Sequence, residues 1–404
     1  MPALAQLDAQ IAIPELLVRI NDWVPQVRRA AKVALRSMMT PDNAAALVDH
    51  LPGIDHLARQ QRDDHAVLIE EVHAYLLRAE NVHHIVNAVS GPKPRVARIA
   101  SQMCMTHLLL PQHDLLVLSL ASADMLTRLS VLPLLHQGDM ADRLPLLATA
   151  LANSCMPLRR AAFMVYCKEQ PVESTGIAQS LLFDRSATVR ELALNVLVKR
   201  GVSVSALLRP ILEQSSAPPD RLRHAIWGLA QLGQLDAVPR LKDFVSDFHP
   251  SMRRAAVLAL AKLDSANAAG YLLAGLRDAS PVVHKGLTRQ IIRSGVDISV
   301  DDVGALLHEN LPHLCHAALT LAPETGKWEW LLLLLEAVQL PPGLISQQEM
   351  ANELAHWDQA FNLSYLQPTS RQISRIRREV EQCGSRLGQG YRELIEFSLP
   401  GLQR

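Results

Sequence analysis

Apolar residues along this chain recur with the period of an α-helix, in short runs. One run fills positions i, i+3, i+4 and i+7 with Met252, Ala255, Ala256 and Ala259. A Pro or an acidic residue stands near the start of the runs. Pro suits the first helical turn, because its missing N–H has no partner to lose there, and a preceding Asp or Asn can accept hydrogen bonds from that turn. The pattern therefore predicts short amphipathic helices and no β-sheet.

These runs belong to an internal repeat. The string Asp-aromatic-x-Pro-x-apolar-Arg-Arg-Ala-Ala stands at residues 22–31 and again at 247–256, with weaker copies at 153–162, 184–193 and 278–287. Anchoring each copy on the apolar residue before the basic pair gives ten positions with a mean spacing of about 32 residues. The anchors are Val27, Ala66, Val96, Leu126, Leu158, Val189, Leu222, Met252, Val283 and Leu314. The first step, of 39 residues, is the irregular one.

Each copy has room for two helices, and a hairpin of about 30 residues cannot bury both of its faces alone. Stacked hairpins bury a continuous core, so we expect an all-α solenoid, an α-α superhelix of about ten hairpins. The repeat ends at Pro341-Pro342-Gly343, a strong helix stop. The predicted organisation is a solenoid over residues 1–340 and a helical, non-repeat segment over 341–404.

The motif Asp…Pro-x-Val-Arg-x-x-Ala, clearest at 22–31, 184–193 and 247–256, resembles the second helix of a HEAT repeat. The resemblance covers residues 10–325. The period is shorter than that of long HEAT repeats, and is similar to the short HEAT-like repeats of bacterial proteins, including relatives of phycobilisome lyases. In HEAT proteins such Asp and Arg residues bridge adjacent repeats. This implies a structural ladder here, formed by Asp22, Arg28, Asp184, Arg190, Asp247, Arg253 and Asp278.

Charge and cysteine usage narrow the functional classes. Forty basic and forty acidic residues cancel, so no global field attracts nucleic acid or an anionic membrane. The five cysteines are scattered and never spaced as CxxC, which favours a reducing compartment over a disulfide framework. Neither a secretory signal nor a run of about 20 apolar residues is visible, so we expect a cytoplasmic protein without membrane insertion.

The sequence contains none of the motifs GxSxG, GxxxxGK[ST] and HExxH, and we expect no enzyme activity, no cofactor and no metal. His313 and His316, close to His308 and Cys315, have a chelating i, i+3 spacing, but neither HExxH nor CxxC accompanies them. A rival function comes from the alkylpurine DNA glycosylases, which resemble a HEAT-like fold and use a basic concave face. The residues that would supply that face are Arg159, Arg160, Arg190, Arg223, Arg253, Arg254 and Trp227. Zero net charge and few aromatic residues count against it.

Aromatic residues gather in the C-terminal segment, where Trp357 and Phe361 stand four residues apart. A helix beginning near Ser370 carries an apolar stripe and a basic stripe, the latter made of Arg371, Arg375 and Arg378. Two interpretations stay open. The segment is either a cap over the last hydrophobic face of the solenoid or a docking module that binds a partner through Trp357, Phe361 and the three arginines.

The function that this sequence favours is protein–protein interaction along an extended helical surface, as a scaffold, adaptor or assembly factor. An inhibitor or immunity-type protein that wraps its target is an alternative, as are the lesion-recognising glycosylase and a lyase or chaperone for a tetrapyrrole protein. The sequence names no partner.

Overall fold

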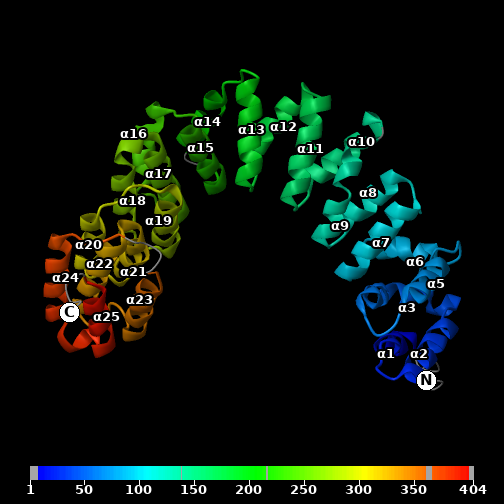
Figure 1. Ribbon diagram of the computed structural model, residues 1–404. Coiled ribbons are helices and arrows are strands. Elements are labelled where there is room, and N and C mark those ends of the chain that lie inside the picture. Colours follow the sequence, from blue (N-terminus) through cyan, green and yellow to red (C-terminus); the bar gives the residue numbers. More distant parts are fainter. Residues whose placement is uncertain (1–7, 138, 215–216, 361–365, 400–404) are drawn as a thin grey trace. The chain divides into compact units, whose positions relative to one another are not determined.

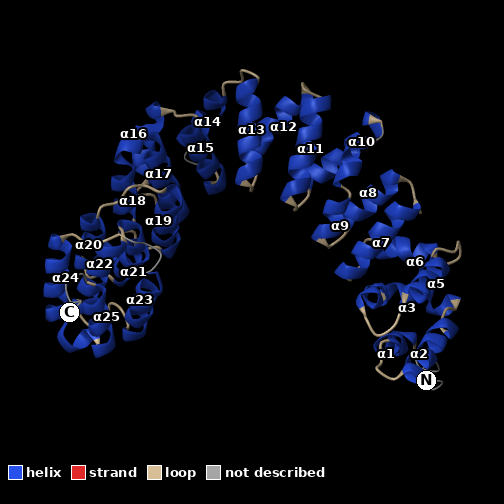
Figure 2. Ribbon diagram, in the orientation of Figure 1, coloured by secondary structure: helices blue, strands red, loops and turns tan. Residues whose placement is uncertain are grey.

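The computed structural model describes residues 8–137, 139–214, 217–360 and 366–399, and every regular element within them is a helix (Figure 2). The predicted all-α class is therefore confirmed. The chain divides into two compact units, residues 1–201 and 202–404. In both units helices pair into hairpins; we call the first helix of each hairpin A and the second B.

Six hairpins form the first unit (Figure 1). Their B helices begin at or just after the repeated Pro or acidic positions, as the pattern predicts. In the second hairpin the A helix is broken into two short pieces. The hairpins are α1 (Ala9–Ile20) with α2 (Pro25–Ser37), α3 (Ala44–Asp49) and α4 (Leu51–His56) with α5 (Ala66–Leu76), α6 (Val82–Ala88) with α7 (Pro94–His107), α8 (Gln112–Ala121) with α9 (Met125–Ser130), α10 (Met140–Ala152) with α11 (Met156–Glu169), and α12 (Glu173–Leu181) with α13 (Ala187–Lys199).

Four hairpins open the second unit, followed by four further helices. The hairpins are α14 (Val204–Glu213) with α15 (Pro219–Gln231), α16 (Val238–Phe244) with α17 (Pro250–Leu263), α18 (Ala268–Gly275) with α19 (Pro281–Ser294), and α20 (Val300–His308) with α21 (Pro312–Leu321). The remaining helices are α22 (Lys327–Gln339), α23 (Gln347–Ala360), α24 (Ser370–Cys383) and α25 (Gln389–Ser398). Short 3-10 turns such as η5 (Leu235–Ala237) and η6 (Ser265–Asn267) lead into the A helices of two of the hairpins.

All ten predicted anchors fall within the first four residues of ten different B helices. Two of these anchors do not occupy the buried position of their helices. Ala66 is exposed and Leu126 is 48% exposed, whereas Leu68 and Thr127, the third residues of α5 and α9, are buried in their place. One helical residue turns a side chain by about 100°, so an error of one or two positions moves the anchor off the buried face.

Each unit has its own hydrophobic cluster, one running from Ala12 to Tyr166 and the other from Val257 to Leu399. The apolar run at residues 331–335 lies in α22 and is fully buried. Helices α22 and α24 pack against each other inside the second unit, on either side of the predicted boundary at residue 340. That boundary stays a prediction. Among the described helices, none combines the length and apolar character needed to cross a membrane.

Candidate binding surface

The arginine at the fourth position of the B helices reaches back to the turn in front of its own helix. Its Nη1 donates to the carbonyl oxygen of the residue that opens the repeat motif, six positions earlier. The distances are 2.9 Å for Arg28 to Asp22, 2.7 Å for Arg190 to Asp184 and 2.9 Å for Arg253 to Asp247. These six predicted ladder residues are thus paired within their own repeats.

The same arginine also reaches the aspartate of the following repeat. Arg253 binds both carboxylate oxygens of Asp278, with distances of 2.5 and 2.9 Å. Arg159 binds both oxygens of Asp184 at 2.8 Å, and this pair is almost fully buried. Each carboxylate in turn accepts the backbone N–H two residues later, at Ser280 and Ser186 respectively, which fixes the turn into the next B helix. A fork of this kind is a strong, directional contact between repeats.

One such pair escaped the sequence reasoning. Arg98 on α7 binds both oxygens of Asp124, at 2.9 and 2.7 Å. The available signal was the distance along the chain, because Asp124 follows Arg98 by 26 residues and Asp184 follows Arg159 by 25. The hydrogen bonds from Arg98 hold the pKa of the Asp124 carboxyl well below its usual range, and Arg253 lowers the pKa of Asp278 in the same way.

The predicted partner-binding residues of the C-terminal segment lie in different environments. Trp357 is only 1% exposed, and its indole nitrogen donates to the Lys327 carbonyl oxygen at 2.9 Å. It is a core residue rather than a surface anchor, because its ring packs edge-on against Trp328. Phe361 lies outside the described residues.

The three arginines of α24 also differ in exposure and in contacts. Arg375 reaches back to Glu336 on α22 at 2.5 Å, so it links two packed helices. Arg378 is exposed and lies 3.5 Å from its neighbour Glu379. Arg371 is exposed and makes no ion pair or hydrogen bond with any described residue. The structure therefore leaves Arg371 and Arg378 accessible to a partner and ties Arg375 into the fold.

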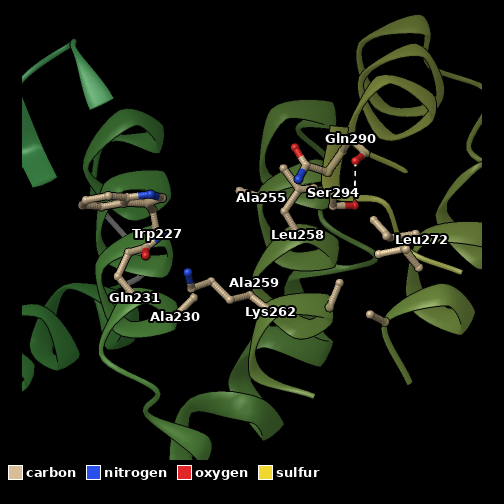
Figure 3. Close-up of a pocket in the computed structure, with 13 residues that line it drawn as sticks. Trp227, Ala230, Gln231, Ala255, Leu258, Ala259, Lys262, Leu272, Gln290 and Ser294 are labelled. Atoms are coloured by element: carbon tan, nitrogen blue, oxygen red, sulfur yellow. Dashed lines mark hydrogen bonds between the residues drawn. The ribbon is translucent and has the colours of Figure 1, made fainter. Parts of the chain in front are cut away.

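A groove in the second unit runs across three successive B helices, α15, α17 and α19 (Figure 3). Its volume is about 490 Å³, within the range typical of ligand-binding clefts. Trp227 and Gln231 contribute from α15, Leu258 from α17, and Gln290 and Ser294 from α19. Sequence reasoning missed the groove, apart from naming Trp227 in the glycosylase alternative.

The floor and the rim of this groove differ in chemistry. Small and aliphatic side chains, including Ala255, Ala259 and Leu272, form the apolar part of the lining. Polar side chains stand at the edge: Gln231, Lys262 and Ser294 are exposed. In Figure 3 the Lys262 side chain extends from α17 toward Gln231 on α15. The alanines keep the helical backbones uncovered, and so a side chain from another molecule can enter between them.

The other predicted alternatives find less support in the contacts of the described residues. Two of the arginines proposed for a glycosylase-like face, Arg159 and Arg253, are held by carboxylates in the repeat contacts above. Arg223 pairs with Asp220. Within the described part of the chain, no group of three or more His, Cys, Asp or Glu residues is arranged to hold a metal ion.

Comparison with known proteins identifies the family of the repeat in part of the chain. The family described as HEAT repeats matches residues 205–291, which span α14 to most of α19. No curated protein matches the chain. A chain from a solved structure concerning Kap95p binding to RanGDP is similar over 96% of this chain and 69% of its own length, with 12% identity and a TM-score of 0.39. That likeness is too weak to inform function.

The family match falls on the hairpins that build the groove. The same hairpin continues beyond it, and the arginine contacts of Arg253 recur at Arg28 and Arg159 in the first unit. The narrower resemblance to short bacterial repeats stays a prediction. Residues 205–291 of this chain thus match the family of HEAT repeats.

Proposed function

We propose that this protein is a non-enzymatic interaction scaffold that binds a segment of another protein in the groove of α15, α17 and α19. The observation that carries the proposal is the apolar groove that the B helices α15, α17 and α19 build together with Ala268 and Leu272 of the A helix α18. Contiguous apolar surface, unlike single exposed apolar side chains, often marks a site of interaction. Proteins also place ligand-binding clefts where apolar walls meet a few polar groups at the rim, as they do here.

The repeat contacts support this role. One Arg–Asp fork joins α17 to the turn before α19, and a more deeply buried one joins α11 to the turn before α13, both through charge-assisted hydrogen bonds. Helices joined in this way can present their side chains to a partner without first becoming ordered, which lowers the entropic cost of binding. The five cysteines are free thiols, in keeping with work in a reducing compartment.

The test is affinity capture from the source organism with a groove-filling variant. Gln290 is half-buried and lines the groove, so Gln290→Trp places a large ring where a partner side chain would enter. Lys242→Trp, on the exposed surface of α16, is the matched control. We expect a stoichiometric protein partner with the wild type and the control, and its loss with Gln290→Trp while circular dichroism stays unchanged.

Equal capture by all three proteins would overturn the groove as the binding site. Capture of nucleic acid alone, released by salt, would replace the proposal with the glycosylase alternative. The effect of the protein on its captured partner separates the remaining roles: an inhibitor abolishes an activity of that partner, whereas an adaptor leaves the activity intact and joins the partner to a third component.

A further inference from the structure

We infer that the segment bound in this groove is acidic and carries a large aliphatic side chain. This inference deepens the proposed function and rests on it. The aliphatic side chain enters the apolar floor between α15, α17 and α19, and carboxylates on either side of it meet the cations of α17 and α19.

The charge distribution of the three helices supports an acidic partner. Together α15, α17 and α19 carry eight of the chain's forty basic residues and only one of its forty acidic residues, Asp220. That one carboxylate is already paired with Arg223. None of the residues that line the groove bears a carboxylate. The zero net charge of the whole chain therefore conceals a strongly basic local surface.

Five cations of this surface make no ion pair or hydrogen bond with any described residue. They are Arg254, Lys262, Lys285, Arg289 and Arg293. This sets them apart from Arg253, whose guanidinium binds Asp278 and two carbonyl oxygens. Like charges gathered without counter-charges repel one another, and an acidic ligand would relieve that repulsion.

These cations all belong to α17 and α19, two of the helices that build the groove. Lys262 is part of the lining. Arg254 crosses from α17 to α19, because a Cβ built on Gly286 would stand 2.5 Å from its Nε atom. Along α19, Arg289 and Arg293 each precede a lining residue, Gln290 and Ser294, by one position. One position is about 100° around the helix, so the cationic stripe runs beside the groove rather than inside it.

The floor of the groove favours an aliphatic side chain over a nucleobase. Its buried part consists of Ala230, Ala259, Ala268 and Leu272, which offer no hydrogen-bond partner to a base edge. A site that reads or holds bases combines stacking aromatics with polar groups around the base. The lining contains a single aromatic residue, Trp227. Leucine or isoleucine matches the alanine-rich floor in size and polarity.

The inference can be tested by selection from a display library of random short peptides against the full-length protein. We expect the enriched peptides to be net negative and to share a Leu, Ile or Met. Lys262→Glu combined with Arg289→Glu should weaken their binding by about tenfold, since each exposed pair contributes modestly and reversal adds repulsion. Lys242→Glu, on α16, is the matched control and should leave affinity unchanged. Gln290→Trp should abolish binding by filling the groove.

Single-stranded DNA and oleate serve as competitors for the selected peptides. Enriched peptides that are neutral or basic would overturn the inference, even if Gln290→Trp removes their binding; the scaffold proposal would then stand with a different partner chemistry. Groove occupancy by DNA or oleate in the absence of any enriched peptide would also overturn it. The scaffold proposal fails independently, through equal capture of partners by wild type and Gln290→Trp.

Discussion

At the scale of single residues, two neighbouring arginines in the same motif have opposite roles. The first of the Arg-Arg pairs at 28–29, 159–160 and 253–254 is turned into the repeat contact and bonds the turn in front of its helix. The second, Arg29, Arg160 or Arg254, makes no ion pair or hydrogen bond with any described residue. The 100° step between consecutive helical residues separates these roles. The first arginine bonds to the repeat contact, and the second has no carboxylate partner among the described residues.

Removing a carboxylate from a buried fork should destabilise the protein far more than removing one from the surface. In the Arg159–Asp184 pair the side chains are 5% and 7% exposed, so Asp184→Ala leaves a buried guanidinium without its partner. We expect a loss of about 3–5 kcal/mol in the free energy of unfolding. Arg209 and Asp236 are 46% and 55% exposed, so Asp236→Ala should cost no more than about 1 kcal/mol. Urea denaturation of both variants measures the difference, and equal losses would show that the forks do not hold the repeats together.

At the scale of helices, Gly275 marks a close approach of α18 to both α19 and α17. A Cβ on Gly275, at the end of α18, would stand 2.5 Å from the Leu287 Cδ1 atom and 3.2 Å from the Val257 Cγ1 atom. Both neighbours are buried and branched, and they cannot move aside freely. On the same helix, a Cβ on Gly270 would meet nothing within 4 Å.

Alanine should therefore have opposite effects at these two glycines. Gly270→Ala should raise stability by about 0.5–1 kcal/mol, because alanine loses less backbone entropy in a helix. Gly275→Ala should lower it by about 1–3 kcal/mol through overpacking. Thermal unfolding followed by circular dichroism distinguishes them. A stabilising effect at both positions would mean that α18 does not pack against α19 and α17 as described.

Much of the helical architecture could be predicted from the sequence, because a repeat of about 32 residues leaves a periodic signal in apolar and proline positions. The register failed at Ala66 and Leu126, which lack the Arg-Arg pair that follows the anchors Val27, Leu158 and Met252. There the buried third position is filled by Leu68 and Thr127, and a buried threonine is not part of an apolar pattern. The sequence also could not decide whether Trp357 is a core residue or a partner-binding residue, because an aromatic residue on a helix can face either the core or a partner.

At the scale of the whole molecule, the candidate groove could not be predicted from composition. Net charge averages the basic helices α15, α17 and α19 with acidic segments elsewhere, and so it hides the local surface. The lining residues come from separate repeats, from Trp227 to Val296, and most are alanine or other residues without chemistry of their own. They form a groove only because the packing of successive hairpins brings these positions together and leaves the space between them open.

The central claim, that a protein segment occupies this groove, is tested most directly by site-specific photo-crosslinking in cells of the source organism. A photoreactive amino acid at Gln231, on the exposed rim, reports on the groove, and the same group at Lys242 on α16 serves as the control. We expect one discrete protein to be crosslinked from position 231 and not from 242, and mass spectrometry to map the crosslink to an acidic segment. Crosslinks from both positions alike, or none from position 231, would contradict the central claim.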